Sequence, residues 1–299
     1  MYLPNKCRYD DKKYSNDKEL IWWAEDSGKM DLCPYKEAKE TMLTAERKYI
    51  FSRVIPATRT ILAARRAHTL DLHGVKDSLS GEYTKYEGAL AKAADAFKEA
   101  ENIFNDPGFH NHEGWKKDAT NDWGETVYAK QTDRGKMVTI STELEGDPDF
   151  VMKEIWKRVE GLPNWSEQVD YTKLVARPTE NFDIITYGKD GNILVSGRDY
   201  VTARIYRKVD DGYILASRSV ELDEKPTPEK MERAQLHLAA AKLHPHSEKA
   251  GFTHCDVVML TDLKGMLPKM AVNYALGKMM LRDAEENQAH FHDLKEKKV

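Results

Sequence analysis

The side chains best suited to metal or acid–base chemistry in this chain are histidines, and their spacing does not form a site. The segment HNHE (residues 110–113) supplies two histidines and a glutamate between Gly108 and Gly114. The glycines predict a loop and no third ligand is nearby in the sequence, so we expect no bound metal there. Three further histidines are interpreted as exposed strand and turn residues: His237, His244 and His246.

Other catalytic patterns are also missing from the sequence. It contains neither a phosphate-binding P-loop nor a dinucleotide-binding glycine fingerprint. Cys7, Cys33 and Cys255 are scattered and include no C-x-x-C pair, which favours a reducing compartment over a disulfide framework or a zinc site. We therefore expect a binding protein rather than an enzyme, with no cofactor. A hydrolase is the disfavoured alternative.

Composition excludes further classes. The 299 residues are 40% hydrophobic and 32% charged, as in globular proteins with a polar surface, and the formal net charge of -4 argues against general nucleic-acid binding. No apolar run reaches the length of about 18 residues that suggests a membrane span. The N-terminus has no hydrophobic signal core, so we expect a cytoplasmic protein.

Residues 1–80 are predicted to form an N-terminal extension. Residues 1–35 are highly charged, and we expect them to be mostly disordered, with one docking turn at residues 21–23. Residues 36–73 look helical, and nine Lys or Arg residues outnumber four Asp or Glu residues over 36–76. This basic amphipathic segment fits an anionic membrane surface, its own domain or a protein partner, and these alternatives stay open.

The remaining chain alternates helical and strand patterns that predict an α+β domain. Alternation between Ala234 and Ala240 favours a strand over 231–244, although the alanine and leucine content also suits a helix. The predicted order is a helix over 89–105, a hairpin of 125–131 and 136–143, a helix after Asp147, strands at 171–176, 182–187, 198–209, 213–220, 231–244 and 255–260, and a final helix from Lys269.

The final helix is apolar on two sides. One face carries Tyr274 and Leu281, together with Leu267, Met270 and Ala271, and the opposite face carries Val272, Leu276, Met279 and Met280. A helix buried on both sides within a large core would show this pattern. The alternative is a lid, with one face on a lipid-filled cavity and the other available to a membrane or a partner.

Three segments carry a family resemblance: Trp165, the strand SGRDYVTARIYRKV (196–209) and the segment TDLKGMLPKMAVNYAL (261–276). With DWGETVYA (122–129), they resemble the START domain of lipid-transfer proteins, in the branch of the steroidogenic acute regulatory protein and its late-endosomal relative. The resemblance implies that residues 85–295 form a helix-grip fold. In that fold a curved antiparallel β-sheet surrounds a hydrophobic tunnel closed by the C-terminal helix.

The resemblance also implies a polar end to the tunnel at Arg204, which shares a strand face with Thr202. Related sterol carriers place an acid on the preceding strand, where this sequence has Ile185. Asp183 lies two residues earlier on the same face and could substitute, or Tyr187 could supply a hydroxyl, and these alternatives stay open. An exposed strand arginine is the alternative interpretation, because a buried arginine needs a partner.

By the same resemblance, other residues would touch the ligand or form the gate, although ordinary core packing explains each of them equally well. The further ligand contacts would be Leu162, Trp165, Ser166, Met270, Ala271 and Tyr274. The gate would consist of Gly188, Gly191, Leu194, Gly197, Arg198, Asp262, Lys264 and Pro268.

The sequence thus predicts an intracellular carrier that binds a sterol and transfers it between membranes without covalent chemistry. It would be peripheral at the endosome, endoplasmic reticulum or mitochondrion, touch these membranes transiently, and bind no nucleic acid. One alternative is the same fold carrying a phospholipid, ceramide or carotenoid. Another is a lipid-sensing tethering or regulatory protein that uses residues 1–80 to bind a protein partner.

Overall fold

The computed structural model describes residues 7–9, 22–26, 29–32, 69–192, 195–266 and 269–297, with side chains from residue 69 onward except at 269–271. The chain divides into two compact units, residues 1–66 and 67–299, which are described separately. Within the described ranges, no helix combines the length and the apolar character needed to cross a membrane.

The first unit contains a small antiparallel sheet. Strand β2 (Trp22–Asp26) pairs with β1 (Cys7–Tyr9) on one side and with β3 (Lys29–Leu32) on the other. The expectation of a docking turn at residues 21–23 is therefore wrong at Trp22 and Trp23, which begin strand β2. Aromatic residues such as Trp22 and Trp23 favour extended strands, and sequence-distant pairing partners are not visible in local charge patterns. Most of the predicted basic helix lies outside the described residues.

The second unit begins with a hairpin of β4 (Thr69–Leu72) and β5 (Val75–Ser78). His73 and Gly74 connect the strands, and both have positive φ, as a two-residue hairpin turn with the right twist requires. The helix predicted to continue to residue 73 is therefore wrong for its last residues, because this turn and strand pairing override the helical pattern.

The main sheet is antiparallel along its whole path. Its order is β6-β7-β8-β15-β14-β12-β11-β10-β9, and the short β13 (Met231–Arg233) pairs in parallel with β11. The strands predicted from alternation are confirmed, including the ambiguous one at 231–244. The strand bounds are β6 Lys116–Thr120, β7 Thr126–Thr132, β8 Gly135–Glu145, β9 Tyr171–Ala176, β10 Phe182–Lys189, β11 Gly197–Val209, β12 Gly212–Ser219, β14 Gln235–Pro245 and β15 Phe252–Asp262.

Helices begin where their caps predict. The Asp147 side chain accepts a hydrogen bond of 2.8 Å from the Phe150 amide, and Pro148 occupies the first turn of α5 (Pro148–Lys157). The remaining helices are the 3-10 helices η2 (Gly81–Tyr86) and η3 (Val159–Asn164), α3 (Glu87–Phe104), the short α4 (Pro107–His110) and α6 (Lys269–Glu296).

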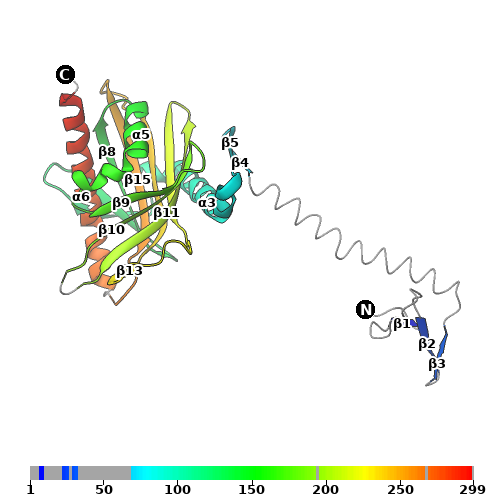
Figure 1. The fold of residues 1–299 in the computed structure, drawn as a ribbon. Coiled ribbons are helices and arrows are strands. Elements are labelled where there is room, and N and C mark those ends of the chain that lie inside the picture. The colour runs from blue at the N-terminus through cyan, green and yellow to red at the C-terminus, as the bar shows by residue number, and fades with distance from the viewer. Residues whose placement is uncertain are drawn as a thin grey trace. The chain divides into compact units, whose positions relative to one another are not determined.

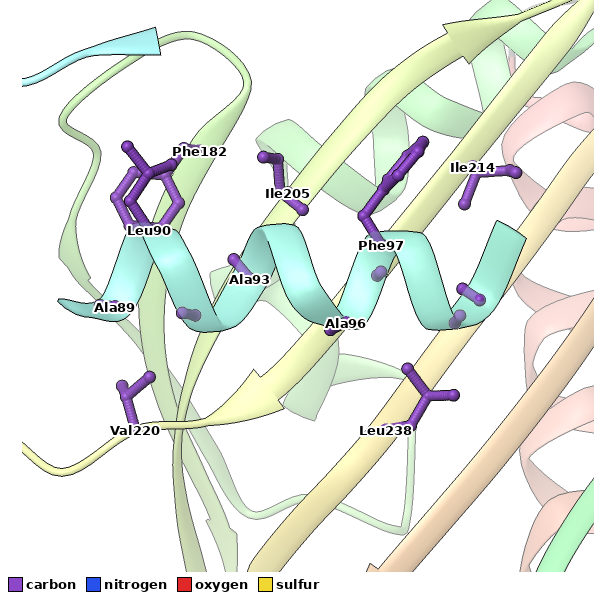
Figure 2. Packing of buried hydrophobic residues seen from close by; sticks show 14 of the residues in the cluster. Ala89, Leu90, Ala93, Ala96, Phe97, Phe182, Ile205, Ile214, Val220 and Leu238 are labelled. Atoms are coloured by element: carbon purple, nitrogen blue, oxygen red, sulfur yellow. The ribbon is translucent and has the colours of Figure 1, made fainter. Parts of the chain in front are cut away.

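Helix α3 covers one face of the sheet. Leu90, Phe97 and the small residue Ala93 point from α3 toward Ile205 and Ile214 of the sheet (Figure 2). Alanines along the contact face let the helix axis approach the strands closely, and this cluster forms the main apolar core.

Helix α6 lies on the opposite side of the sheet from α3 (Figure 1). Strand β15 shows the division: Val258 packs in the core under α3, while Val257 packs near α6. Leu276 and Met280 of α6 are buried against β7 and β8, leaving the C-terminal helix as a cover over one face of the sheet.

A buried ion pair fastens the β4–β5 hairpin to β11. The Arg207 guanidinium bonds to the Asp77 carboxylate, and both side chains are at most 1% exposed. Arg207 also donates to the Leu72 carbonyl at 2.8 Å, and Thr179 donates to the second oxygen of Asp77. Every oxygen of this buried carboxylate is therefore paired, which offsets its desolvation.

Asp77→Ala should lower the free energy of unfolding by about 3–5 kcal/mol, because it leaves the Arg207 charge buried without its partner. Denaturant unfolding followed by tryptophan fluorescence measures this. Asp71→Ala, an exposed position on the same hairpin, is the control and should change stability by less than about 0.5 kcal/mol. Equal effects of the two substitutions would show that the pair does not hold the hairpin.

Candidate functional site

A deep hollow of about 350 Å³ lies between the sheet and α6. Its walls come from the inner faces of β8, β10, β11 and β15, from α5 and η3, and from α6. Most of its surface is aliphatic or aromatic, as in sites for small apolar ligands. The polar exceptions include Thr202 and Arg204 on β11 and Asp283 on α6.

A second hollow of about 410 Å³ adjoins it at the gate. The loop that follows β10, the end of β15 and the middle of α6 line this space. The two hollows share wall residues from five parts of the chain, so they form two halves of one tunnel under α6. The shared residues are Val169, Tyr187, Leu236, Ala239, Val257, Met280 and Asp283.

Arg204 has a buried acidic partner. It faces Asp183 directly in the β10–β11 register, and donates through Nε at 2.8 Å and one Nη at 2.7 Å to the two carboxylate oxygens. Arg177 donates to the same carboxylate at 2.9 Å. Asp183 is completely buried behind these two guanidinium groups and does not line either hollow. Of the partners that the sequence left open for Arg204, the structure shows Asp183.

Trp156 fixes the position of both arginines. Its indole ring lies 4.6 Å from the Arg204 guanidinium carbon and 5.5 Å from that of Arg177. The indole nitrogen donates to the Glu180 carbonyl at 2.9 Å, so the ring cannot rotate freely. The ring thus stabilises both guanidinium groups through cation–π contacts.

The deep end of the tunnel keeps hydrogen-bonding capacity. Within the described residues, Arg204 Nη1 makes no hydrogen bond, and the fully buried Thr202 Oγ1 also has no partner. Thr202 and Arg204 lie two residues apart on one strand face, and both line the hollow. A buried hydroxyl without a partner costs about 1–3 kcal/mol, which a ligand oxygen at this point would relieve.

Tyr187 stands where the two hollows meet. Its ring stacks on Tyr200 of β11 with centroids 4.8 Å apart. Burial raises the pKa of the Tyr187 hydroxyl well above its ordinary value, and the Tyr200 and Asp283 charges add to the shift. Tyr187 therefore stays a neutral hydroxyl, and Ile185 lines the deeper hollow beside it.

The segment after η3 latches α6. Ser166 Oγ donates to Glu286 at 2.9 Å, Arg282 donates to Glu167 at 2.7 Å, and the Trp165 ring stacks on His290 at 4.3 Å. Trp165 and Leu162 line the deep hollow, as the resemblance implied, whereas the structure places Ser166 in the latch.

Arg198 ties the gate together. Its guanidinium donates to the Leu263 carbonyl at 2.9 Å and to the Lys264 carbonyl at 3.1 Å, which connects β11 to the turn before α6. Asp262 accepts from the Lys264 amide at 2.9 Å and also pairs with the Lys264 ammonium group. Gly188 and Gly191 line the outer hollow, and Gly197 begins β11 beside them.

Some predicted contacts lie elsewhere or outside the described residues. Tyr274 is exposed and lines neither hollow, which corrects its expected place at the ligand. The helix rotates this position outward because Leu276 and Met280 pack under it on β7 and β8. The undescribed positions are Leu194, Pro268 and the side chains of Met270 and Ala271.

The structure adds a polar stripe that the sequence analysis missed. Asp283, Asn287 and His290 line the deep hollow from α6. Their spacing of four and three residues places them on one helix face, and a search for polar as well as apolar stripes would have found them. Burial raises the pKa of the Asp283 carboxyl to about 6, and the neighbouring Glu286 charge contributes.

Comparison with known proteins agrees with this geometry. A family model described as START domain matches residues 95–297. Steroidogenic acute regulatory-like protein 1 from Caenorhabditis elegans is 47% identical over 241 residues, covering 80% of this chain and 93% of that protein. The mitochondrial steroidogenic acute regulatory protein of Mus musculus is 28% identical over 180 residues, which span 58% of this chain and 63% of that protein.

A solved structure shows the same fold. Human StAR-related lipid transfer protein 5 superimposes with a TM-score of 0.60 at 18% identity, covering 69% of this chain and 99% of that one. The predicted family and α+β fold are thus confirmed, with a large antiparallel sheet and a C-terminal helix packed against it. This chain therefore belongs to the START domain family of lipid-binding proteins, among those related to the steroidogenic acute regulatory protein.

Proposed function

We propose that this protein binds a sterol under α6 and transfers it between membranes without chemical change. The observation that carries the proposal is an apolar tunnel that ends at an unpaired donor and an unpaired hydroxyl, Arg204 Nη1 and Thr202 Oγ1. A lipid with a rigid apolar body and one terminal hydroxyl matches that distribution. The relatedness to steroidogenic acute regulatory proteins supports the choice of a sterol.

Binding strength of the required size follows from apolar burial. Burying roughly 400 Å² of ligand surface at about 25 cal/mol per Å² contributes on the order of 10 kcal/mol, enough to compete with a bilayer. Release then requires the cover to move, so lid opening would limit the transfer rate. Mass spectrometry of lipid that copurifies with the full chain tests the ligand class: a sterol supports the proposal, and a phospholipid, ceramide or carotenoid overturns it.

The gate carries exposed apolar side chains that suit contact with a membrane. Met266, in the turn before α6, is fully exposed, and Val195 of the facing loop is 36% exposed. Val195 lines the outer hollow, and so does Leu263, which lies three residues before Met266 in the sequence. A lipid that leaves through this gate would therefore pass directly from the tunnel into the bilayer touched by these residues. We propose an intracellular, peripheral location at organelle membranes, in keeping with the mitochondrial name of the mouse relative.

Arg204→Leu should reduce the preference for cholesterol over its analogue without the 3-hydroxyl by about 10- to 100-fold, because a charged donor to the hydroxyl is lost. Competition binding with the two sterols measures the preference. Arg177→Leu is the matched control, since it removes the other cation from Asp183 but lies outside the hollow. Unchanged preference in Arg204→Leu, or equal loss in both variants, would remove Arg204 from the ligand site.

Met266→Asp should slow sterol transfer between vesicles several-fold while leaving sterol affinity unchanged, because an acid at the gate opposes insertion into the bilayer. Transfer is followed by fluorescence between donor and acceptor vesicles. Trp123→Asp, another exposed apolar position, in the β6–β7 turn, is the control. Loss of transfer in the control but not in Met266→Asp would place the membrane contact elsewhere.

A further inference from the structure

Asp283 is a carboxylate inside an apolar tunnel. It lies on α6 where the two hollows meet, and it lines both of them. Within the described residues, its side chain has neither a hydrogen bond nor an ion pair. The fold therefore does not use this charge for itself, whereas Asp183 and Asp77 are fully paired.

Within the part of the chain that the structure describes, no cation forms an ion pair with Asp283. Glu286, one turn along α6, is another acid, and it is engaged by Ser166 and Arg282. Tyr187 of β10 and Cys255 of β15 stay neutral, because burial raises the pKa of each. Arg204 lines the deeper hollow, but its guanidinium is paired with Asp183.

We propose that Asp283 is the second polar contact of the lipid site and selects lipids with a second hydrogen-bond donor, a hydroxyl or amine, at the middle of the tunnel. This inference rests on the proposed sterol function and refines its ligand class. A donor at this point replaces the water that the carboxylate loses when the tunnel fills. Asn287, one turn along α6, donates to the Asp283 carbonyl at 2.7 Å and leaves its own amide oxygen available beside it.

A lipid that is entirely apolar at this point should bind in a pH-dependent way, unlike a lipid that carries a donor there. It would desolvate the carboxylate without replacing the lost hydrogen bonds, so Asp283 would bind a proton as the ligand enters. The free protein already holds this carboxyl at a pKa of about 6. Such a lipid therefore binds tightly at pH values below 6, and its affinity falls progressively at higher pH. The loss approaches tenfold for each pH unit above that value. A donor-bearing lipid escapes this loss.

The test compares cholesterol with its side-chain hydroxylated derivatives and an amino-sterol, on the full chain at about pH 5 and about pH 8. Wild-type protein should lose cholesterol affinity by tenfold or more between these pH values, and at least one donor-bearing sterol should keep its affinity. Asp283→Asn should abolish the pH dependence for cholesterol. Asp293→Asn, an exposed position on α6 that lines neither hollow, should behave as wild type.

The outcomes separate this inference from the proposed function. Cholesterol binding with the same affinity at both pH values, or a pH dependence that survives Asp283→Asn, overturns the role of Asp283 alone. Failure of wild-type protein to bind any of these sterols overturns the sterol function itself.

A further readout needs no ligand: Asp283→Asn should raise the melting temperature of the free protein at about pH 8 but not at about pH 4. The raised pKa means that folding favours the protonated form, so its stabilising effect is lost as pH rises through 6.

An independent cluster lies on the sheet away from the tunnel. His244 of β14 and His254 of β15 are direct partners across the two strands, and Asp256 follows on the same face. One nitrogen from each histidine and a carboxylate oxygen all lie within 4.8 Å of one another. Asp256 is 1% exposed, and its Oδ2 has no hydrogen-bond partner, although Ser141 donates to Oδ1 at 2.5 Å.

We infer that these three side chains bind a first-row divalent cation such as Zn²⁺. Ligand atoms on a tetrahedral zinc are separated by roughly 3.3 Å. Here His254 Nε2 lies 3.3 Å from Asp256 Oδ1, and His244 Nε2 lies 3.9 Å from Asp256 Oδ2. The His244 Nδ1 atom lies 3.3 Å from the Pro245 carbonyl, the second contact that orients a metal-binding imidazole. His244 was expected to be an exposed strand residue. The structure places it on β14 but half-buried, and the proposed site gives it a role as a metal ligand.

Titration of the full chain with Zn²⁺ by calorimetry, and with Co²⁺ by absorbance, tests the site. Wild type should bind one equivalent with a Kd of about 10 µM or tighter. His254→Gln and Asp256→Asn should each weaken binding at least tenfold. His237→Gln is the control, because His237 lies on β14 like His244 but outside the cluster. No saturable binding by wild type, or unchanged binding by a well-folded His254→Gln variant, overturns the site.

Discussion

The structure depends on how α6 is held over a sheet face that the chain itself does not fill. Along its first half, Leu276 and Met280 pack on β7 and β8, and Lys136 of β8 bonds to both Asp118 and the Asn273 carbonyl. Gly277 lets the helix approach β6 closely, because a Cβ there would collide with the Asp118 carboxylate. Along its second half, Phe291 is buried against α5 and β15, and polar contacts such as the one between Ser166 and Glu286 are added to this packing.

The apolar and the polar contacts of α6 differ in their strength and in how they respond to pH and salt. Apolar packing is not directional and changes little with pH or salt, whereas exposed polar pairs are weak and are exchanged readily with water. The contact between Arg282 and Glu167 is half-exposed or more on both sides, so it adds little to overall stability.

Buried charge is treated in three different ways in this fold. Asp77 and Arg207 form a closed pair that fastens a hairpin, and Asp183 is shared between two arginines while one of them still reaches the tunnel. Among the described side chains, Asp283 has no partner. Paired charges can be buried because their hydrogen bonds replace hydration, while an unpaired carboxylate in an apolar space keeps hydration or a proton. The difference separates residues that hold the fold from residues that are free to meet a ligand.

The sequence by itself determined the order of the longer helices and strands from residue 89 onward, their antiparallel pairing and the presence of a closing helix, because alternation, caps and helical periodicity are local properties. It also named Asp183 as one candidate partner of Arg204, whereas the strand register of the folded protein decided that the two residues face each other. The tertiary structure decided which side of α6 meets the tunnel. That choice depends on where the helix axis rests on β7 and β8, so Tyr274 turned outward and Asp283 inward. It also decided the pairing of residues 69–72 with 75–78 and the meeting of His244, His254 and Asp256, because contacts between strands are made by residues that no local pattern connects.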